Sequence, residues 1–535
     1  MSKRSLAVVV FIFFTSISLV AQVEEPYIFG KLVDSQTKGP VVFATVRLKN
    51  KPLGVITDKN GGFRIPTDFL IQGDVLEISC MGYGSKEVVL SSLATDKVNI
   101  IMMDTAVFTL NETTVTAELK YLSAETIVQY AINNIKNNYP QEPYRYLGYY
   151  RDYQLKQDNY VNLNEALIEV WDNGFQSIDT SLTNFLLHDY RKNVAFEIDS
   201  FASKPYDYTN KDKVVPSASF GSPVSNEFML LRIHNPIRNH RTNTFSYIYR
   251  LPKDFIKNHI LLLKGTTVYN NKEVYEIEIF RETLGFTVTG RIFIDKANFA
   301  IRKLDYGVKQ FPIRNQDLGF SDQVKLPSTE DGNTLFEINI EYQEAGEAEK
   351  MYLNYISFRN RFKIIRPGAF KMENLTVDRS NRHIEVVFNN SLAKDQLLRP
   401  SFFRLHYLGK EIPVVRVTRK TEKSILLKLG NPRTEEKLVN RLFSHIFNPE
   451  RDALELKMRR IKDSKGNLLD KRKEEMLDQF REFFTQEVIL SKKDRVGKEN
   501  FMLKNRALSD PKQPMFVSDS TRRYWMNTPL KVIDN

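Results

Sequence analysis

The stretch Gly54-Val-Ile-Thr-Asp-Lys-Asn-Gly-Gly-Phe-Arg-Ile65 decides how the first hundred residues fold. Asn60 and Gly61 accept a positive φ at little steric cost, and the Asp58 carboxylate can bond backbone amides two residues further on. A tight turn therefore joins two short strands. Phe63 and Ile65 alternate with Arg64, which puts the two apolar side chains on one face of the second strand.

Short strands and turns continue on both sides of this hairpin at a spacing of about 8 to 12 residues, which is typical of a small β-sandwich. We predict seven strands, at 27–33, 41–48, 54–57, 62–65, 75–81, 85–90 and 98–103. The first predicted domain covers residues 22–104.

Four motifs in this region resemble the carboxypeptidase-regulatory-like domain, a seven-stranded prealbumin-like sandwich. They are Ile28-Phe-Gly-Lys-Leu-Val-Asp34, Ala44-Thr-Val46, the 54–63 stretch and Met81-Gly-Tyr83. In that family the domain is an accessory module, fused to peptidases in some proteins and to outer-membrane receptors or uncharacterised envelope proteins in others. The resemblance therefore implies a compartment and not a reaction.

The N-terminus has the pattern of a secretory signal. Lys3 and Arg4 precede an apolar run at 6–20 that ends at Ala21, so residues 1–21 are predicted to be a signal peptide. The run is shorter than the roughly 20 residues of a membrane-spanning helix. We expect export to the periplasm or the outer-membrane surface of a Gram-negative-type envelope, as a mature chain without a transmembrane helix that is soluble or held by a partner.

Cys80 is the only cysteine, so a disulfide within the chain is impossible even in an oxidising compartment. Its place in a predicted core strand favours a buried apolar residue over a reactive thiol. The net charge of +12 is uneven, because residues 366–535 carry 36 Lys and Arg against 23 Asp and Glu. Export disfavours nucleic acid as the partner of this basic third. Anionic glycan or lipid and a merely solvated surface both stay open.

The middle of the chain predicts an antiparallel α+β sheet domain at 123–365, after a linker at 105–122. Ile127, Ala131 and Ile135 recur at helical spacing behind Ser123, a suitable N-cap. A hairpin at 145–155 and 160–171 comes next, then a loop-rich stretch at 172–243, and then alternating strands at 274–281, 286–295, 300–308, 334–344 and 351–363.

Gly148-Tyr-Tyr-Arg151 and Gly290-Arg-Ile-Phe-Ile-Asp295 resemble the middle region of envelope proteins of unknown function that also begin with the regulatory-like domain. Many of those proteins continue into a membrane β-barrel. The segment after residue 365 is too short and too charged for one. A curved middle sheet like that of lipid or lipoprotein carriers is a possible analogy of fold, which carries no site.

The sequence of the C-terminal third predicts three parts. They are a sandwich at 366–470, an amphipathic helix at 471–490 and an extended or disordered tail at 491–535. Glu385-Val-Val-Phe-Asn-Asn-Ser-Leu392 and Phe402-Phe-Arg-Leu405 resemble a bacterial immunoglobulin-like domain, interrupted by a helical stripe at 438–447. Apolar residues at Leu477, Phe480, Phe484 and Val488 recur at helical spacing. Tyr524-Trp525 in the tail is a candidate docking anchor.

No catalytic motif is present. The seven histidines do not stand in a zinc-binding helical spacing, and the sequence contains neither a nucleophile elbow nor a phosphate-binding loop. The histidines are His188, His234, His240, His259, His383, His406 and His445.

Two sets of oxygen ligands are candidate sites. The turn residues Asp58 with Asn60, and Asp463 with Asn467, suit calcium, but turn geometry explains them equally well. Asp152, Glu165, Glu169 and Asp172 could form a glycosidase-like pair on adjacent strands, although chance proximity in a charged hairpin is the simpler explanation. We therefore assign no catalytic, cofactor-binding or metal-binding residue and expect no cofactor.

The fold class predicted overall is mainly β and multidomain. The predicted function is that of an exported, non-enzymatic cell-envelope protein that acts as a binding or scaffolding module for an envelope protein, a glycan or an anionic lipid. Two alternatives are a lipid or lipoprotein carrier that uses the curved middle sheet, and a hydrolase whose site lacks a recognisable motif. The sequence does not fix the oligomeric state.

Overall fold

The computed structural model describes most of the chain, in sixteen stretches. They are 27–49, 51, 53–67, 73–106, 122–157, 159–194, 196–205, 226–243, 247–270, 272–311, 333–346, 349–366, 368–430, 436–444, 454–490 and 496–517. The predicted signal peptide, the linker core at 107–121 and the Tyr524-Trp525 pair lie outside them.

The N-terminal unit is the predicted seven-stranded sandwich. Its two sheets have the strand orders β4-β1-β7 and β3-β2-β5-β6, and β1 pairs with β7 in parallel. Leu32, Phe63 and Ile78 belong to the core between them. The elements are β1 Tyr27–Asp34, β2 Thr45–Leu48, β3 Gly54–Ile56, β4 Gly62–Pro66, β5 Val75–Ser79, β6 Lys86–Val89, the 3-10 helix η2 Leu90–Ser92 and β7 Asn99–Met103.

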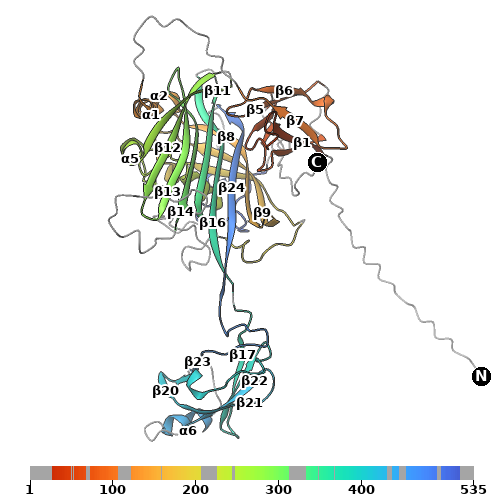
Figure 1. Ribbon diagram of the computed structural model, residues 1–535, viewed down its shortest axis with the longest axis vertical. Coiled ribbons are helices and arrows are strands. Elements are labelled where there is room, and N and C mark those ends of the chain that lie inside the picture. Colours follow the sequence, from red (N-terminus) through yellow and green to blue (C-terminus); the bar gives the residue numbers. More distant parts are fainter. Residues whose placement is uncertain are drawn as a thin grey trace, which may run out of the picture.

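The middle unit is built on one antiparallel sheet of ten strands, in the order β10-β9-β8-β24-β16-β15-β14-β13-β12-β11 (Figure 1). The predicted hairpin and the five later strands are all present. The strands are β8 Tyr144–Lys156, β9 Asn159–Asp172, β10 Asn184–Lys192, β11 Ile260–Tyr269, β12 Lys272–Thr283, β13 Phe286–Asp295, β14 Ile301–Gln310, β15 Asn333–Ala345, β16 Lys350–Arg366 and β24 Lys473–Ile489.

The prediction of an amphipathic helix at 471–490 is wrong. This segment is strand β24, which pairs with β16 on one side and with β8 on the other. Leu477 and Phe483 point to one face of the sheet and Phe480 and Phe484 to the other. Both faces of the strand are covered, so apolar residues occur on each of them. In the sequence, the spacing of these apolar residues is therefore indistinguishable from the apolar stripe of a short amphipathic helix.

The inner face of the sheet, which carries Tyr146, Tyr150 and Ile168, packs on the helices of the middle unit in the largest hydrophobic cluster. Ser123 caps the first helix as predicted, since its Oγ accepts from Thr126 N at 3.2 Å. The predicted loop stretch 172–243 also holds β10 and two short helices. The helices are α1 Ala124–Asn133, α2 Ile135–Asn138, α3 Asp179–Leu182, α4 Glu227–Ile233 and α5 Leu251–Asn258.

The N-terminal sandwich docks on the outer face of the ten-stranded sheet (Figure 1). Arg47 stacks 4.6 Å from the Phe484 ring centroid and donates to the Thr485 carbonyl at 2.7 Å. Gln486 bonds both the amide and the carbonyl of Gly54, at 2.9 and 2.7 Å. The sandwich is therefore fixed to β24 by backbone-directed hydrogen bonds as well as by apolar contact.

The third unit is a two-sheet sandwich inserted between β16 and β24 (Figure 1). Its sheets have the orders β17-β18-β22-β21 and β20-β19-β23 around one shared core, and the predicted helical stripe is α6. The elements are β17 Met372–Asp378, β18 His383–Phe388, the 3-10 helix η4 Pro400–Phe402, β19 Phe403–Tyr407, β20 Lys410–Ile412, β21 Val414–Arg419, β22 Ser424–Leu429, α6 Glu436–Ser444 and β23 Leu454–Met458.

The described part of the tail, 496–517, consists of extended segments, turns and the 3-10 helix η5 Lys498–Asn500. It is packed on the body, because Met502 N and Phe516 N donate to the carbonyls of Phe185 and Leu187, each at 2.8 Å. These bonds cover the edge strand β10. Among the described residues, no helix is long and apolar enough to cross a membrane.

Candidate functional site

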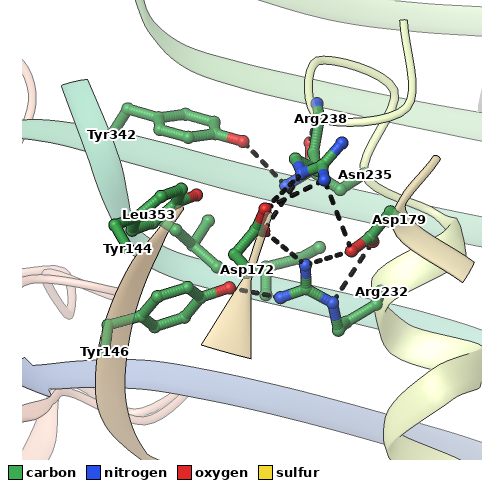
Figure 2. A pocket seen from close by; sticks show the side chains of 10 residues that line it. Tyr144, Tyr146, Asp172, Asp179, Arg232, Asn235, Arg238, Tyr342 and Leu353 are labelled. Carbon is green, nitrogen blue, oxygen red and sulfur yellow. Dashed lines mark hydrogen bonds and ion pairs between the residues drawn. The ribbon is translucent and has the colours of Figure 1, made fainter. Parts of the chain in front are cut away.

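The strongest concentration of buried charge lies where the segment after β10 folds back on the inner face of the sheet (Figure 2). Asp172 ends β9 and Asp179 begins α3, while Arg232 lies in α4 and Arg238 one turn beyond it. All four side chains are nearly inaccessible to solvent. Elements far apart in the sequence thus bring two cations and two anions together.

Each charge of this Asp172–Asp179–Arg232–Arg238 cluster has a partner within it. Arg232 Nη2 lies 2.9 Å from Asp172 Oδ2 and 2.5 Å from Asp179 Oδ1. Arg238 donates to Asp172 through Nε at 3.0 Å and Nη2 at 2.9 Å. Tyr146 OH bonds Arg232 as well. The guanidinium groups are saturated by protein oxygens, so neither is available to an anionic ligand.

The electrostatics of the cluster keep Asp179, Arg232 and Arg238 ionised. Burial disfavours the charged carboxylate of Asp179, but Arg232 and Arg238 outweigh that effect and hold its pKa below the usual range. Burial likewise opposes the Arg232 cation, and the two carboxylates outweigh it, so its pKa lies well above the usual value. No proton in such a balanced set is poised for transfer near neutral pH.

The cavity beside this cluster has room for about 10 Å³, the space of roughly one water molecule. Tyr144, Tyr342 and Ile356 help to close it. Burial raises the pKa of Tyr144 far above the usual value, so its hydroxyl stays neutral. The cluster can lock the α4 segment on the sheet, but it does not leave space for a substrate.

The four carboxylates considered as a glycosidase pair do not converge. Asp152 and Asp172 point to the inner face of the sheet, whereas Glu165 and Glu169 point to the outer face. Asp152 pairs across the strands with Asn164, eight residues before Asp172 on β9, which is about 26 Å along the strand. Glu165 and Glu169 are about 13 Å apart on the same basis. Both separations exceed those of glycosidase pairs.

Each of these acids also has its own structural partner. Asp152 Oδ1 accepts from the side-chain amides of Gln154 and Gln479, at 2.9 and 2.8 Å. Tyr149 OH donates to Glu165 at 2.9 Å. Glu169 contacts Arg145 at 3.2 Å and His188 Nε2 at 3.0 Å, and Asp172 belongs to the cluster described above. These contacts account for the four acids as cross-strand and loop-fixing groups.

The two oxygen-rich turns are explained by their own hydrogen bonds. Asp58 Oδ1 accepts from the amides of Asn60 and Gly62, both at 2.8 Å. Asp463 Oδ1 accepts from the Asn467 amide at 2.8 Å, and Oδ2 accepts from its side chain at 2.9 Å. In the described ranges, no three metal-ligating side chains come together.

Cys80, His234 and His259 are buried, whereas His383 and His406 of the inserted sandwich are partly exposed. Burial raises the pKa of the Cys80 thiol to about 11, so it stays protonated in the sandwich core. His234 is wholly buried and stacks on the Phe358 ring with centroids 3.6 Å apart. Burial lowers its pKa to about 3 and the pKa of His259 to about 4. His445 lies outside the described residues.

A second buried ion pair escaped sequence reasoning. Arg151 of β8 and Glu482 of β24 pair on the outer face, beneath the N-terminal sandwich, and Tyr153 OH donates to Glu482 at 3.0 Å. The adjoining cavity, next to Ile56, also has room for about 10 Å³. Arg151 and Glu482 are 331 positions apart in the chain, and only a strand assignment for 473–489 would have suggested the pair.

The comparisons with known proteins concern two parts of the chain. A family model described as a CarboxypepD_reg-like domain matches residues 28–115. These residues form a CarboxypepD_reg-like domain. The resemblance predicted from the sequence motifs is thereby confirmed. No curated protein matches the chain significantly.

Three solved structures are similar to part of the chain at low identity. A LolA superfamily protein from Nitrosomonas europaea is 12% identical over 45% of this chain and 86% of its own, with a TM-score of 0.18. A DUF1329 family protein from Desulfovibrio piger is 11% identical over 44% and 86%, with a TM-score of 0.18. A putative outer membrane lipoprotein-sorting protein domain from Vibrio parahaemolyticus is 9% identical over 44% and 86%, with a TM-score of 0.20. Such TM-scores carry no functional argument.

Proposed function

We propose that this is an exported, non-enzymatic cell-envelope protein that acts as a binding or scaffolding module. The observation that carries the proposal is how β24 joins the three units. The CarboxypepD_reg-like sandwich docks on residues 484–486 of this strand, and the inserted sandwich begins where β16 ends and ends where β24 begins. One strand therefore holds two separate β-modules on a common sheet.

The site geometry supports a non-enzymatic role. The four charges of the Asp172–Asp179–Arg232–Arg238 cluster are paired with each other, as are Arg151 and Glu482, and the cavities beside both sets are the size of a water molecule. The signal pattern at 1–21 supports export. The carboxypeptidase-regulatory-like resemblance supports an envelope location, the periplasm or the outer-membrane surface, since in that family the module is fused to envelope proteins in some members, although to peptidases in others.

The inserted sandwich is the unit that we propose meets a partner. It lies at the far end of the β16–β24 ribbon, apart from the sheet (Figure 1). Residues 367–472 hold 23 Lys and Arg against 13 Asp and Glu, a net charge of +10 out of +12 for the whole chain. Anionic envelope components are attracted to such a unit through a field that salt screens.

The test removes this unit without disturbing the sheet. Arg366 and Lys473 stand opposite each other in the β16–β24 ladder, so an Asn-Gly turn can replace residues 367–472. Crosslinking in intact cells followed by mass spectrometry should give envelope partners for the full chain and lose some of them for the shortened chain. Turnover of ester, peptide or glycoside substrates by the purified full chain would contradict the proposal.

A carrier role is the second candidate, favoured by the apolar cluster between the inner face and helices α1, α4 and α5. A ligand would have to displace Phe228, Leu231 or Phe255 from that cluster, because they occupy the inner face. Organic extraction of the purified protein tests this candidate. One lipid species in stoichiometric amount would favour a carrier, and its absence would favour the scaffold.

A further inference from the structure

The sheet β4-β1-β7 of the N-terminal sandwich turns an apolar face outward. Leu32 and Ile101 point into the sandwich core, so their strand neighbours point away from it. Phe29, Ile100 and Met102 are 36%, 46% and 46% exposed. The outward face of a sheet in a sandwich is ordinarily polar, so three large apolar side chains on one small face require an explanation.

This face is not the one that docks on the body. The contacts with β24 come from β2 and β3 of the other sheet, through residues such as Arg47, Gly54 and Ile56. Figure 1 shows β1 and β7 on the side of the sandwich away from the ten-stranded sheet. In the part of the chain that the structure describes, the body leaves the apolar face accessible.

Cationic side chains surround the apolar ones. Lys31 pairs across the strands with Ile100, and Arg64 with Phe29. Lys38 Nζ lies 3.8 Å from Met102 Sδ. The outward positions of β1 and β7 on this face are Tyr27, Phe29, Lys31, Val33, Ile100 and Met102, which include no carboxylate. The charge of the face is therefore complementary to an anionic partner.

The edge of this sheet is protected against strand addition. β7 is an edge strand, and Lys86 Nζ donates to its Met102 carbonyl at 2.8 Å. A lysine at an edge strand blunts pairing with another chain. At this edge a partner therefore has to lie on the face and not extend the sheet beyond β7.

The area of the face limits what the partner can be. Three strands about 4.8 Å apart and five residues at about 3.3 Å each cover roughly 240 Å². A stable protein interface buries about 800 Å² on each side. A second copy of this chain or another folded protein would be poorly held, whereas a bilayer surface needs only a few inserted apolar side chains and nearby cations.

We propose that this face docks on an anionic lipid bilayer surface. Phe29, Ile100 and Met102 enter the boundary between headgroups and acyl chains, and Lys38, next to Met102, contacts the lipid phosphates. The inference deepens the proposed scaffold function and rests on it, because it names the surface to which the scaffold is held. Its failure and the failure of that function give different results in the tests.

The test is co-sedimentation of the full chain with vesicles of phosphatidylcholine containing about a quarter phosphatidylglycerol. The variant Ile100→Thr/Met102→Thr keeps β-compatible side chains, and we expect its affinity to fall about tenfold. The control Ile260→Thr removes an apolar side chain that is 57% exposed on strand β11 of the middle sheet, and should bind as the wild type does. Circular dichroism confirms that each variant is folded.

The electrostatic contribution is tested by the variant Lys38→Gln, in which the lost charge should weaken binding about fivefold at low salt. Equal binding to vesicles of phosphatidylcholine alone would overturn the proposal, as would wild-type affinity of the Ile100→Thr/Met102→Thr variant. If vesicle binding is absent and that variant loses a crosslinked protein, the face binds protein and the scaffold function stands. Turnover of an ester, peptide or glycoside substrate would instead contradict the scaffold function without affecting the interpretation of vesicle binding.

Discussion

Replacing Asp172 by alanine should destabilise the middle unit more than any surface substitution. Its carboxylate accepts from Arg232 and Arg238 and also from the Gly174 amide at 2.9 Å. The side chain is fully buried. Without it, two guanidinium groups share Asp179 alone, and the buried cluster carries one uncompensated positive charge.

Removing one partner of a buried ion pair costs about 3–5 kcal/mol, because the remaining charge stays buried. We expect the free energy of unfolding of the middle unit to fall by that amount in Asp172→Ala. The matched control is Asp189→Ala on the neighbouring strand β10, whose partner Arg191 is 66% exposed. Exposed ion pairs contribute at most about 1 kcal/mol to the free energy of unfolding, so the control should change it little.

The assay is urea unfolding followed by the fluorescence of Trp171, which precedes Asp172 on β9. The second tryptophan, Trp525, is replaced by phenylalanine throughout, so that the signal reports the middle unit. If Asp172→Ala lowers the free energy of unfolding by less than about 1 kcal/mol, as the control does, the cluster is not the buried lock that the distances indicate. The small loss would then have to be explained by relaxation of the α4 segment.

Buried groups give three further predictions. Burial lowers the pKa of His234 to about 3 and the pKa values of His240 and His259 to about 4, so on acidification the unfolded chain, with histidine pKa values of about 6.5, binds protons first. The free energy of unfolding should therefore fall from pH 6.5 toward pH 4, by about 1.4 kcal/mol per pH unit for each histidine. An unchanged urea midpoint between pH 7 and pH 5 would contradict this. Gly148→Ala would place a Cβ 2.1 Å from a phenylalanine ring of β24, so we expect about 1–3 kcal/mol of destabilisation in the same assay and would abandon the packing argument if stability rose. Arg47→Ala removes charged hydrogen bonds to β24, so we expect faster amide hydrogen exchange in β2 and β3. Exchange at the wild-type rate would mean that apolar contact alone holds the N-terminal sandwich on the middle sheet.

Local patterns predicted local structure well. The Asp58 turn, the hairpin of β8 and β9 and the Ser123 cap all depend on residues within a few positions of each other, and the structure contains each of them. The seven-stranded sandwich follows from the same kind of signal, repeated along about 80 residues. The sequence also correctly assigned Cys80 to a core.

The same patterns failed where a segment is covered on both faces. In β24, Arg481 and Glu482 are buried beside Asp152 and Arg151 of the neighbouring strand. A charged residue ordinarily indicates a solvent-exposed face, so these two residues made the segment resemble an amphipathic helix with one charged side. Their partners are more than 300 residues away, and no local pattern reveals them.

The candidate site was hidden for a similar reason. Asp172 stands out in the sequence as an acid of the hairpin, but Arg232 and Arg238 lie in a stretch that the sequence indicates only as loop. Two arginines six positions apart next to Asn235 do not form a motif. Their role emerges only when the α4 segment is laid against the inner face, because a buried guanidinium requires a carboxylate and the two aspartates are the ones within reach.

The central position of β24 in the sheet explains both its buried charges and its contacts with the other two units. Strands β10, β9 and β8 on one side and β16 to β11 on the other are joined only through this strand, so a chain that ends before Lys473 leaves β8 and β16 as two open edges. The strand that closes the sheet is also the one on which the CarboxypepD_reg-like domain rests and from which the inserted sandwich departs. Arg481 and Glu482 of this strand are buried because helix α4 covers its inner face and the N-terminal sandwich its outer face. Both are tolerated there because each has a partner on β8. A single late segment of the chain thus completes the sheet and fixes both modules to it, which is the physical basis for a scaffold.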